Sequence, residues 1–241
     1  MVRTSKPVQR IPILMTRPAG SNRRFLDRIA PDFKSRLEVV TSPLISIEPL
    51  DANAKLCSTD AAIFTSSNGV GFAPPGKGRR AYCVGQHTTG TAQSNGWDAV
   101  FAGADASGLV TSLRHIAPAC DLVHFHGRHV RGNVVEQLQA AGMQARSVVV
   151  YDQVLQSLTE EALHVLGRKT PVLVPLFSPR TAKHFATLAT AADHTNVIAM
   201  SDAVAEECTQ AGFRSIFVTQ EPTAASMVKC LEKRLLEVCP G

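Results

Sequence analysis

The chain lacks several features that would place it in common classes of protein. It contains no apolar run near the roughly 20 residues of a membrane span, and no signal-peptide stretch follows its basic start, so we expect a soluble, cytosolic protein. Its six cysteines never form the close pairs of zinc or redox motifs, which predicts reduced structural thiols. Neither glycine-rich phosphate-loop motif occurs, which disfavours a nucleotide or sugar-phosphate enzyme.

Aromatic residues are also scarce, since the chain has one tryptophan and two tyrosines. Binding of single-stranded nucleic acid uses aromatic platforms beside basic residues, so we do not expect this function. The net charge of +5 includes local clusters at Arg23 and Arg24, at 77–80, and at Arg128 with Arg131. Such a surplus suits a polyanionic small molecule as well as a nucleic acid, so charge alone does not decide.

The most informative feature is an internal duplication with a spacing of about 115 residues. The segment AIFTSSNGVGF from Ala62 resembles VPLFSPRTAKHF from Val174, and ILMTRPAG from Ile13 resembles LVHFHGRH from Leu122. Arg17 and Arg128 therefore hold equivalent places. This spacing is far longer than a helical or propeller repeat, so it predicts duplicated domains.

Short β-rich runs alternate with helical patterns, which predicts an α/β fold with parallel sheets covered by helices on both faces. The expected strands are 11–15, 38–41, 61–64, 81–84, 99–101, 122–125, 147–150, 172–176, 197–199 and 215–218, and the clearest helices are 133–141 and 224–238. Polar turns follow several strands, at Thr65, Gly85 and Ser178 among others. Open α/β sheets bind ligands at this carboxyl edge.

Seven motifs, in order, resemble the uroporphyrinogen-III synthase family over nearly the whole chain. They are TRP at Thr16, FTSSNGV at Phe64, VGQHTTGTA at Val84, HGRHVRGNVVEQL at His126, VVVYD at Val148, FSPRTAKHF at Phe177 and EPTAASMVKCL at Glu221. No single motif is specific for this family, but the order of all seven motifs, together with the internal duplication, is specific for it.

The resemblance implies two flavodoxin-like, Rossmann-like domains joined by a two-stranded linker, with one domain inserted in the other. It places residues 1–44 and 154–241 in a discontinuous domain and residues 45–150 in the inserted one. The connecting strands are expected at 43–48 and 148–153, where the patterns PLISIEPL and VVVYDQVL are independently typical of extended chain.

The implied activity is that of a carbon–oxygen hydro-lyase of porphyrin and haem biosynthesis. It cyclises hydroxymethylbilane, a linear tetrapyrrole with eight carboxylates, to uroporphyrinogen III with inversion of ring D and loss of water. Because the pyrroles of the substrate supply the electrons, neither a metal nor an organic cofactor is expected. The resemblance further suggests a monomer and transient contact with the preceding enzyme, hydroxymethylbilane synthase, and no nucleic-acid or membrane partner.

Tyr151 is the candidate proton donor, because the resemblance implies that the tyrosine of VVVYD faces the interdomain cleft. An unperturbed phenol titrates near pH 10, so its contribution as an acid should be partial. The alternative is a tyrosine packed at the hinge with its hydroxyl hydrogen-bonded.

Carboxylate binding is expected from hydroxyls, backbone N–H groups and guanidinium groups in the turns that follow strands. The candidates are Arg17, Thr65, Ser66, Ser67, Asn68, Thr88, Thr89, Gly127, Arg128, Arg131, Ser178, Arg180 and Ser201. For any one of them, ordinary helix capping or a solvated surface arginine is the alternative interpretation.

Two further observations leave alternatives open. The turn MSDAVAE stands where many relatives have a glycine and paired threonines, so Ala203 and Val204 offer no hydroxyl there. This departure allows a catalytically degenerate protein that binds a tetrapyrrole or another anion. His124, His126 and His129 are close in sequence, but no acidic or cysteine ligand is beside them, so substrate contact or solvation is favoured over zinc.

Overall fold

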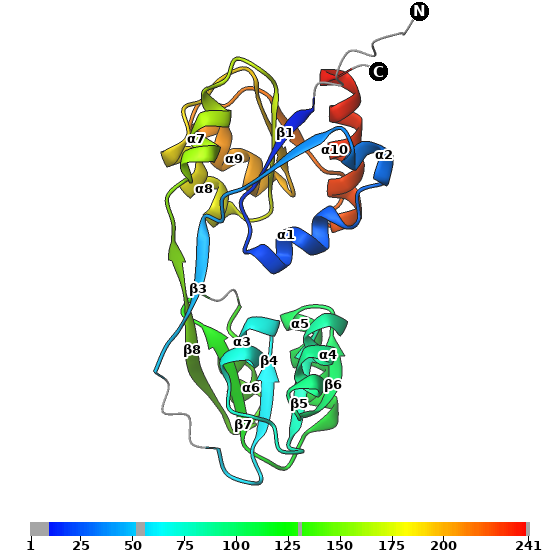
Figure 1. Cartoon of the computed structure of the whole chain (residues 1–241). Coiled ribbons are helices and arrows are strands. Elements are labelled where there is room, and N and C mark those ends of the chain that lie inside the picture. Colours follow the sequence, from blue (N-terminus) through cyan, green and yellow to red (C-terminus); the bar gives the residue numbers. More distant parts are fainter. Residues whose placement is uncertain (1–9, 52–55, 130–131, 240–241) are drawn as a thin grey trace, which may run out of the picture. The chain divides into compact units, whose positions relative to one another are not determined.

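The computed structural model describes residues 10–51, 56–129 and 132–239. The chain divides into two compact units, each of which is an α/β structure in its own right. Unit 1 combines the residues up to Ser46 with those from Leu155 onward, and unit 2 is the continuous stretch Ile47–Val154. The chain therefore passes from one unit to the other twice (Figure 1).

Unit 1 contains a five-stranded sheet in which every described pairing is parallel. The strand order is β11-β10-β9-β1-β2. The strands are β1 (Ile11–Met15), β2 (Leu37–Thr41), β9 (Val172–Leu176), β10 (Thr195–Ala199) and β11 (Ile216–Val218). All residues of β1, β9 and β10 are buried, as expected for inner strands with helices on both faces.

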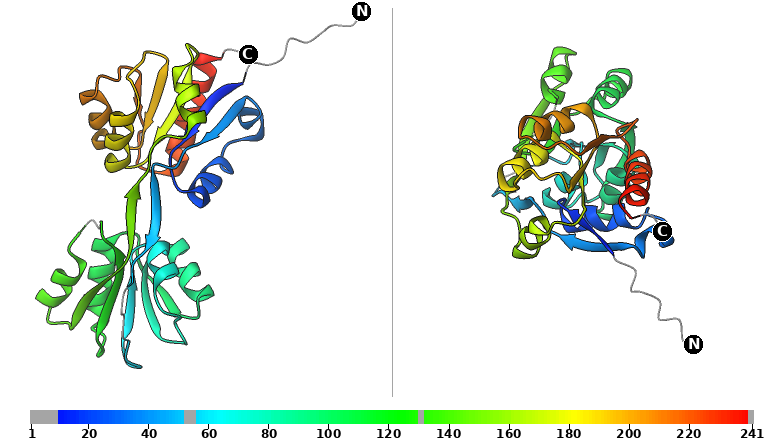
Figure 2. Two further views of the ribbon diagram at one scale, coloured as in Figure 1. Left: turned by 60° about the vertical axis from the view of Figure 1, so that its left-hand side comes forward. Right: turned by 90° about the horizontal axis from the view of Figure 1, so that it is seen from above.

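Two groups of helices cover the faces of this sheet (Figure 2). On one face are α7 (Glu160–Gly167), α8 (Pro179–Leu188) and α9 (Asp202–Gln210), and on the other are α1 (Ala19–Leu26), α2 (Pro31–Lys34) and α10 (Ala224–Val238). Successive strand residues point to opposite faces. Leu14 accordingly packs with Phe185 of α8, whereas Ile13 and Met15 pack with Leu231 of α10.

Unit 2 contains a six-stranded sheet in the order β3-β8-β7-β4-β5-β6. Its strands are β3 (Ile45–Pro49), β4 (Ala61–Phe64), β5 (Arg80–Val84), β6 (Asp98–Gly103), β7 (Leu122–Gly127) and β8 (Ala145–Leu155). The pairings from β8 to β6 are parallel. β3 runs opposite to β8, because backbone hydrogen bonds join Leu50 to Val150 and Gln156 to Leu44.

The helices of unit 2 also form two layers. Val70 of α3 (Ser67–Phe72) and Ala92 of α4 (Gln86–Ser94) pack in the cluster that contains Trp97. Leu109 of α5 (Ala106–Ile116) and Leu138 of α6 (Val134–Ala140) pack on the other face. Each layer covers one side of the sheet, so both faces of β4 and β7 are buried.

The two sheets have the same topology, which confirms the predicted α/β fold class. The order β11-β10-β9-β1-β2 corresponds to β6-β5-β4-β7-β8, with β3 added at the edge of unit 2. Each sheet combines strands from both copies of the sequence repeat, since β1 and β2 precede the inserted unit and β9 follows it. The strand predicted at 147–150 and the connecting strand expected at 148–153 both fall within one longer strand, β8, which spans Ala145–Leu155.

The six cysteines all lie in the described part of the chain and none forms a disulfide. Burial raises the pKa of Cys83 and of Cys208 to about 11, so these thiols stay protonated and act as small core residues. Within the described ranges, no helix is long and apolar enough to span a bilayer.

Candidate functional site

Each sheet has one point where the chain order reverses between two neighbouring strands. In unit 1 this point lies between β1 and β9, and in unit 2 it lies between β7 and β4. Open α/β sheets bind ligands outside the carboxyl ends of the strands at such a point. The segments that leave these strands begin with Thr16, Phe177, Arg128 and Thr65. Most of the predicted site residues therefore lie at two equivalent edges.

Tyr151 occupies the edge of unit 2, beside the end of β7. The register of β7 and β8 places Tyr151 opposite Gly127, and the Tyr151 ring packs closely against this glycine. A Cβ atom on Gly127 would lie 2.3 Å from the Tyr151 ring, so only glycine leaves room for the ring at this position. The Phe72 ring lies 5.9 Å from the Tyr151 ring on another side. The side chain is thus held from several directions.

Hydrogen-bonding groups of Ser66, Asn68 and Gln153 and of the Gly127 backbone lie around the Tyr151 hydroxyl and favour its ionised form. The residue is only 4% exposed. Burial raises the pKa of Tyr151 above its usual value near 10, and these hydrogen bonds partly oppose the increase. The phenol is therefore a neutral group that carries its proton at physiological pH, and it has partners that can stabilise the phenolate.

A pair of buried histidines lies behind this edge. His124 and His126 project from the same face of β7, and their ring centroids are 4.6 Å apart. Nε2 of His124 is 3.1 Å from Oγ1 of Thr65, and Nδ1 of His126 donates to the carbonyl of Gly127 at 2.7 Å. Burial, with a smaller effect of His126, lowers the pKa of His124 to about 3. His124 is therefore neutral and orients the Thr65 hydroxyl.

No group of three potential metal ligands occurs among residues 10–51, 56–129 and 132–239. The histidines considered for zinc are instead engaged with protein groups. His124 contacts Thr65, and His129 lies 3.6 Å from the Asp152 carboxylate.

Arg128 is paired with an acidic residue that sequence reasoning missed. Its Nε lies 3.1 Å from Oδ2 of Asp152, and its backbone N–H donates to the carbonyl of Tyr151 at 2.9 Å. The other carboxylate oxygen of Asp152 faces His129. The only sequence signal was that Asp152 follows Tyr151 directly. Arg131, a predicted companion of Arg128, lies outside the described residues.

The edge of unit 1 presents Arg17 on an aromatic platform. The Arg17 guanidinium lies 4.3 Å from the centroid of Phe177, and Phe25 packs edge-on against the same ring. Burial, with a smaller effect of Arg24, lowers the pKa of Arg17. In the described part of the chain no acidic side chain pairs with Arg17. A partly buried cation of this kind is suited to an anionic ligand.

The serine hydroxyls at these edges cap helices, as the alternative interpretation proposed. Oγ of Ser66 accepts from the backbone N–H of Asn68 at 3.2 Å, and Oγ of Ser178 accepts from that of Thr181 at 3.2 Å. Ser67 and Arg180 lie in the first turns of the helices that these serines cap, α3 and α8. Capping leaves other first-turn N–H groups directed toward the carboxyl edge, where an anion can accept them.

The paired threonines after β5, candidates for carboxylate binding, are enclosed by the protein. Thr88 and Thr89 are buried, and the Thr89 hydroxyl donates to the carbonyl of Gly85 at 3.1 Å. The equivalent turn of unit 1 begins with Ser201, whose side chain makes no capping hydrogen bond, and Asp202 follows it. The negative charge of Asp202 makes this turn the least suited of the set to bind a carboxylate.

Comparison with known proteins agrees with this arrangement. A family model described as uroporphyrinogen-III synthase HemD matches residues 33–229, which is most of the chain. The chain belongs to the uroporphyrinogen-III synthase family. Its function is accordingly that of a uroporphyrinogen-III synthase, a lyase of tetrapyrrole synthesis. A comparison with curated protein sequences gave no match.

Solved structures of two synthases resemble the chain. The uroporphyrinogen-III synthetase from Helicobacter pylori has a TM-score of 0.68 and 16% identity, covering 94% of this chain and 100% of that one. A mutant synthase from Thermus thermophilus has a TM-score of 0.48 and 14% identity, covering 94% of this chain and 99% of that one. At such identities the first likeness shows the fold of the synthase family, and the second carries no argument.

For a uroporphyrinogen-III synthase, the two edges differ in chemistry. The edge of unit 2 has a neutral phenol, a neutral imidazole and a paired arginine, whereas the edge of unit 1 has an arginine without an acidic partner in the described ranges. The structure thus groups Thr65, Ser66, Asn68, Gly127 and Tyr151 in one place. Arg17 and Ser178 belong to the equivalent place of the other unit.

Proposed function

We propose that this synthase acts as a carbon–oxygen lyase on hydroxymethylbilane, with Tyr151 as the proton donor and the carboxyl-edge turns as carboxylate ligands. The main support is the state of Tyr151, a buried and protonated phenol at the switch point of unit 2, with polar groups of Ser66, Asn68 and Gln153 around its oxygen. A general acid must carry its proton at the working pH and must reach the leaving group. The raised pKa of Tyr151 meets the first condition.

In the proposed first step, Tyr151 transfers its proton to the terminal hydroxyl of the substrate. The carbon–oxygen bond breaks, water leaves, and the lone pair of the pyrrole nitrogen supplies the electrons that form an azafulvene cation. The phenolate left behind receives hydrogen bonds from Ser66, Asn68 and Gln153, which lower its free energy. A phenolate near the cation also stabilises it electrostatically.

The remaining steps need neither an oxidant nor a reductant. The substituted carbon of ring D attacks the cation to give a spiro intermediate, which fragments and recloses with ring D inverted. The proton released when the last pyrrole becomes aromatic returns to the phenolate of Tyr151, so the net change is the loss of one water. The main tasks of the protein are to position the chain and to exclude competing closure.

Arg17 is the proposed principal ligand for substrate carboxylates. Its guanidinium is partly buried against Phe177 and has no acidic partner among the residues the structure describes, so a carboxylate can form a charge-assisted pair there. Arg128 is a weaker proposed ligand because Asp152 already neutralises much of its charge. First-turn N–H groups of α3 and α8 complete the proposed set.

The cellular setting is part of the same proposal. Cysteines such as Cys83 and Cys208 that form no disulfide are compatible with a reducing cytoplasm, in which we infer that the protein works as a monomer. Hydroxymethylbilane closes spontaneously to isomer I, so a transient contact with the enzyme that releases it would favour isomer III. A mixture of the two enzymes should then give more isomer III per synthase molecule than the synthase supplied with free substrate.

The test is to supply purified protein with freshly made hydroxymethylbilane, oxidise the products, and separate the III and I isomers against a no-protein control. Predominant isomer III would establish the activity. Isomer I alone, together with tight tetrapyrrole binding, would instead indicate a catalytically degenerate binding protein. No described feature specifically favours that second function, since only the turn at Ser201 and Asp202 departs from a carboxylate-binding design.

A further inference from the structure

A cavity lies in unit 1, away from the switch point. It has a volume of about 490 Å³ and lies between β11, the edge strand of the sheet, and helix α10. Two strands, β10 and β9, separate β11 from β1, so none of the proposed substrate ligands lines it. On the strand side it is lined by Ile216, Phe217 and Val218, of which Phe217 turns its ring toward α10, and its basic wall is formed by α10. The volume is within the usual range for sites of small molecules.

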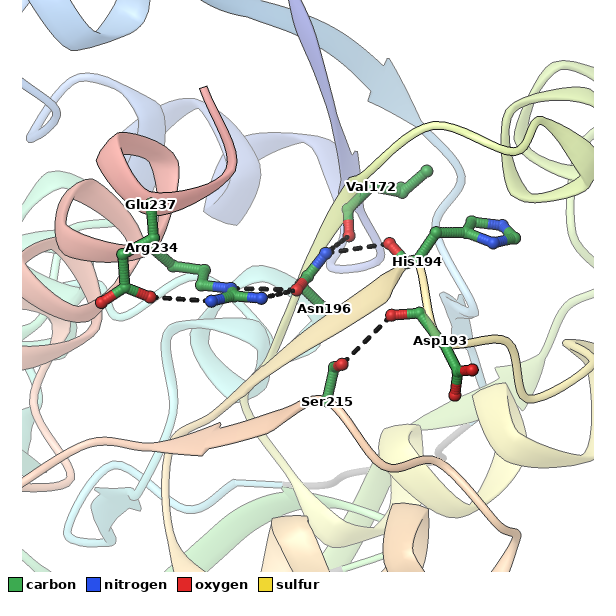
Figure 3. Close-up of polar contacts among 7 residues, drawn as sticks. All are labelled: Val172, Asp193, His194, Asn196, Ser215, Arg234 and Glu237. Carbon is green, nitrogen blue, oxygen red and sulfur yellow. Dashed lines mark hydrogen bonds and ion pairs between the residues drawn. The ribbon is translucent and has the colours of Figure 1, made fainter. Parts of the chain in front are cut away.

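The basic wall contains Arg234, which is fixed from three sides, and Figure 3 shows its contacts with Asn196 and Glu237. Oδ1 of Asn196 accepts hydrogen bonds from Nε and Nη2 of Arg234 at 2.9 and 2.7 Å, and Oε2 of Glu237 accepts from Nη1 at 2.7 Å. The guanidinium also lies 4.3 Å from the centroid of Phe217. The Arg234 guanidinium is therefore held in one position at the middle of the basic wall.

Asn196 is itself anchored in the core of the sheet. It is 2% exposed, and its amide nitrogen donates to the carbonyls of His194 at 2.9 Å and Val172 at 3.4 Å (Figure 3). The side-chain amide of Asn196 is thus held by two carbonyl groups while its oxygen receives Arg234. A buried amide with this arrangement fixes one side of the cavity before any ligand binds.

Two lysines flank the fixed arginine. Lys229 and Lys233 are four residues apart on α10, and both line the cavity. Like charges at this spacing destabilise a helix unless a counterion is present. Within the described ranges neither lysine forms an ion pair, and Glu237, the one acidic residue of the lining, is engaged by Arg234. The cavity therefore has uncompensated positive charge beside an apolar wall.

We propose that this cavity binds a small organic anion that carries two acidic groups on an apolar body. Its acidic groups would pair with Lys229 and Lys233, and its body would pack against the Phe217 ring and the edge of β11. Binding would remove the repulsion between the lysines, so the ligand would also stabilise α10. The site is separate from the synthase reaction and does not depend on the proposed role of Tyr151.

The first experiment uses the full-length protein labelled with ¹⁵N and titrated with benzene-1,2-dicarboxylate. We expect saturable shifts of backbone amides in β11 and α10, and none in the turns after β1, β4, β7 and β9. Succinate, which has a smaller apolar body, and pyrophosphate, which has none, are titrated in parallel. Both should bind at least several-fold more weakly, and equal affinity for pyrophosphate would overturn the role of the apolar wall.

Matched variants separate this site from general attraction of anions. Lys229→Gln with Lys233→Gln should weaken dicarboxylate binding at least tenfold. Lys169→Gln with Lys183→Gln removes the same charge from exposed positions of unit 1 outside the cavity and should leave the affinity unchanged. Equal weakening by both pairs, or no saturable shift in the parent protein, would overturn the proposal. Both variants should retain full synthase activity, so a failure here is distinguishable from a failure of the proposed function.

Discussion

At equivalent places of the two sheets, unit 1 has Ile13, Met15 and Thr16 where unit 2 has His124, His126 and Gly127. An arginine follows in both units, but Arg128 is paired with Asp152 whereas Arg17 lies on Phe177 without an acidic partner in the described ranges. The two copies of the duplication therefore share the backbone arrangement at the carboxyl edge of the sheet, but the side chains at this edge have diverged. The comparison suggests that one edge mainly binds charge and the other mainly handles a proton.

The largest expected difference between the units is in acid stability. The pKa of His124 is about 3 in the folded protein and near 6.5 when unfolded, so the unfolded state binds more protons between these values. Falling pH should therefore destabilise unit 2 below about pH 6.5, by on the order of 4 kcal/mol at pH 3. Trp97, the one tryptophan of the chain, lies in unit 2 and its fluorescence in urea reports this loss.

His124→Ile gives unit 2 the residue that unit 1 has at this place, and it should flatten the pH dependence of the Trp97 transition. The Thr65 hydroxyl is partly exposed and can exchange its lost partner for water. If the variant and the parent lose stability equally between pH 6 and 4, His124 is not the source of acid sensitivity.

The next effect concerns the glycine that unit 1 lacks. Gly127→Ala places a Cβ atom 2.3 Å from the Tyr151 ring, so the ring must move or the strand must shift. We expect about 3 kcal/mol of destabilisation, measured by urea unfolding, and loss of most isomer III formation. Gly71→Ala is the control in the same unit, because an added Cβ there meets no atom within 4 Å. Normal activity of Gly127→Ala would remove the Tyr151 position from the mechanism.

Tyr151→Phe tests the proton-handling role of unit 2. The ring contacts remain, so we expect a ten- to hundredfold decrease in kcat with little change in KM and about 1 kcal/mol of destabilisation. Kinetic assays of isomer III formation over a range of substrate concentrations would separate the two parameters. An unchanged kcat would identify Tyr151 as a packing residue only.

Arg17→Gln and Arg128→Gln compare the charge-binding roles directly. We expect Arg17→Gln to raise KM about tenfold, the effect of one charge-assisted contact, and Arg128→Gln to raise it less because Asp152 already pairs with that side chain. Arg114→Gln, at an exposed position of α5, controls for net charge. Equal increases for the variants of Arg17 and Arg128 would contradict the proposed difference between the units.

The smallest expected effect is at Thr16, which aligns with Gly127. Thr16 is 1% exposed, and its hydroxyl has no hydrogen-bond partner among the described residues. Thr16→Val keeps the shape and removes the unsatisfied group, so the free energy of unfolding should rise by about 1 kcal/mol in calorimetry or urea unfolding. A decrease in stability would mean that the hydroxyl has a partner in solution.

The sequence was sufficient to predict most of the fold because buried parallel strands are short continuous apolar runs. Strands β1, β4 and β9 have the bounds that their apolar runs predicted, and the helix at Ala224–Val238 follows its 3.6-residue pattern. The polar residues Asp152 and Gln153 of β8 lie within the connecting strand expected at 148–153, whereas Ala145 and Arg146 precede every pattern that marked this strand.

The candidate site was only partly predictable. Strand-end turns can be found by their position, which is how Thr65, Ser66, Ser178 and both edge arginines were selected. Pairing of Arg128 with Asp152, stacking of Arg17 on Phe177 and the fit of Tyr151 against Gly127 depend on side-chain conformations and register that sequence patterns do not encode. Burial of Thr88 and Thr89 was missed for the same reason, because turn hydroxyls are usually solvated.

The division of the sheets between the two copies of the repeat has a consequence for synthesis on the ribosome. Unit 2 is one uninterrupted stretch and can fold as soon as Val154 has emerged. Strands β1 and β2 of unit 1 are made first but have no central neighbour until β9 is translated, more than a hundred residues later. The apolar surfaces of these two strands therefore lack their final partner during that interval. Early folding of the inserted unit brings Ile47 and Val154 into one structure. It thereby shortens the effective loop that unit 1 must close.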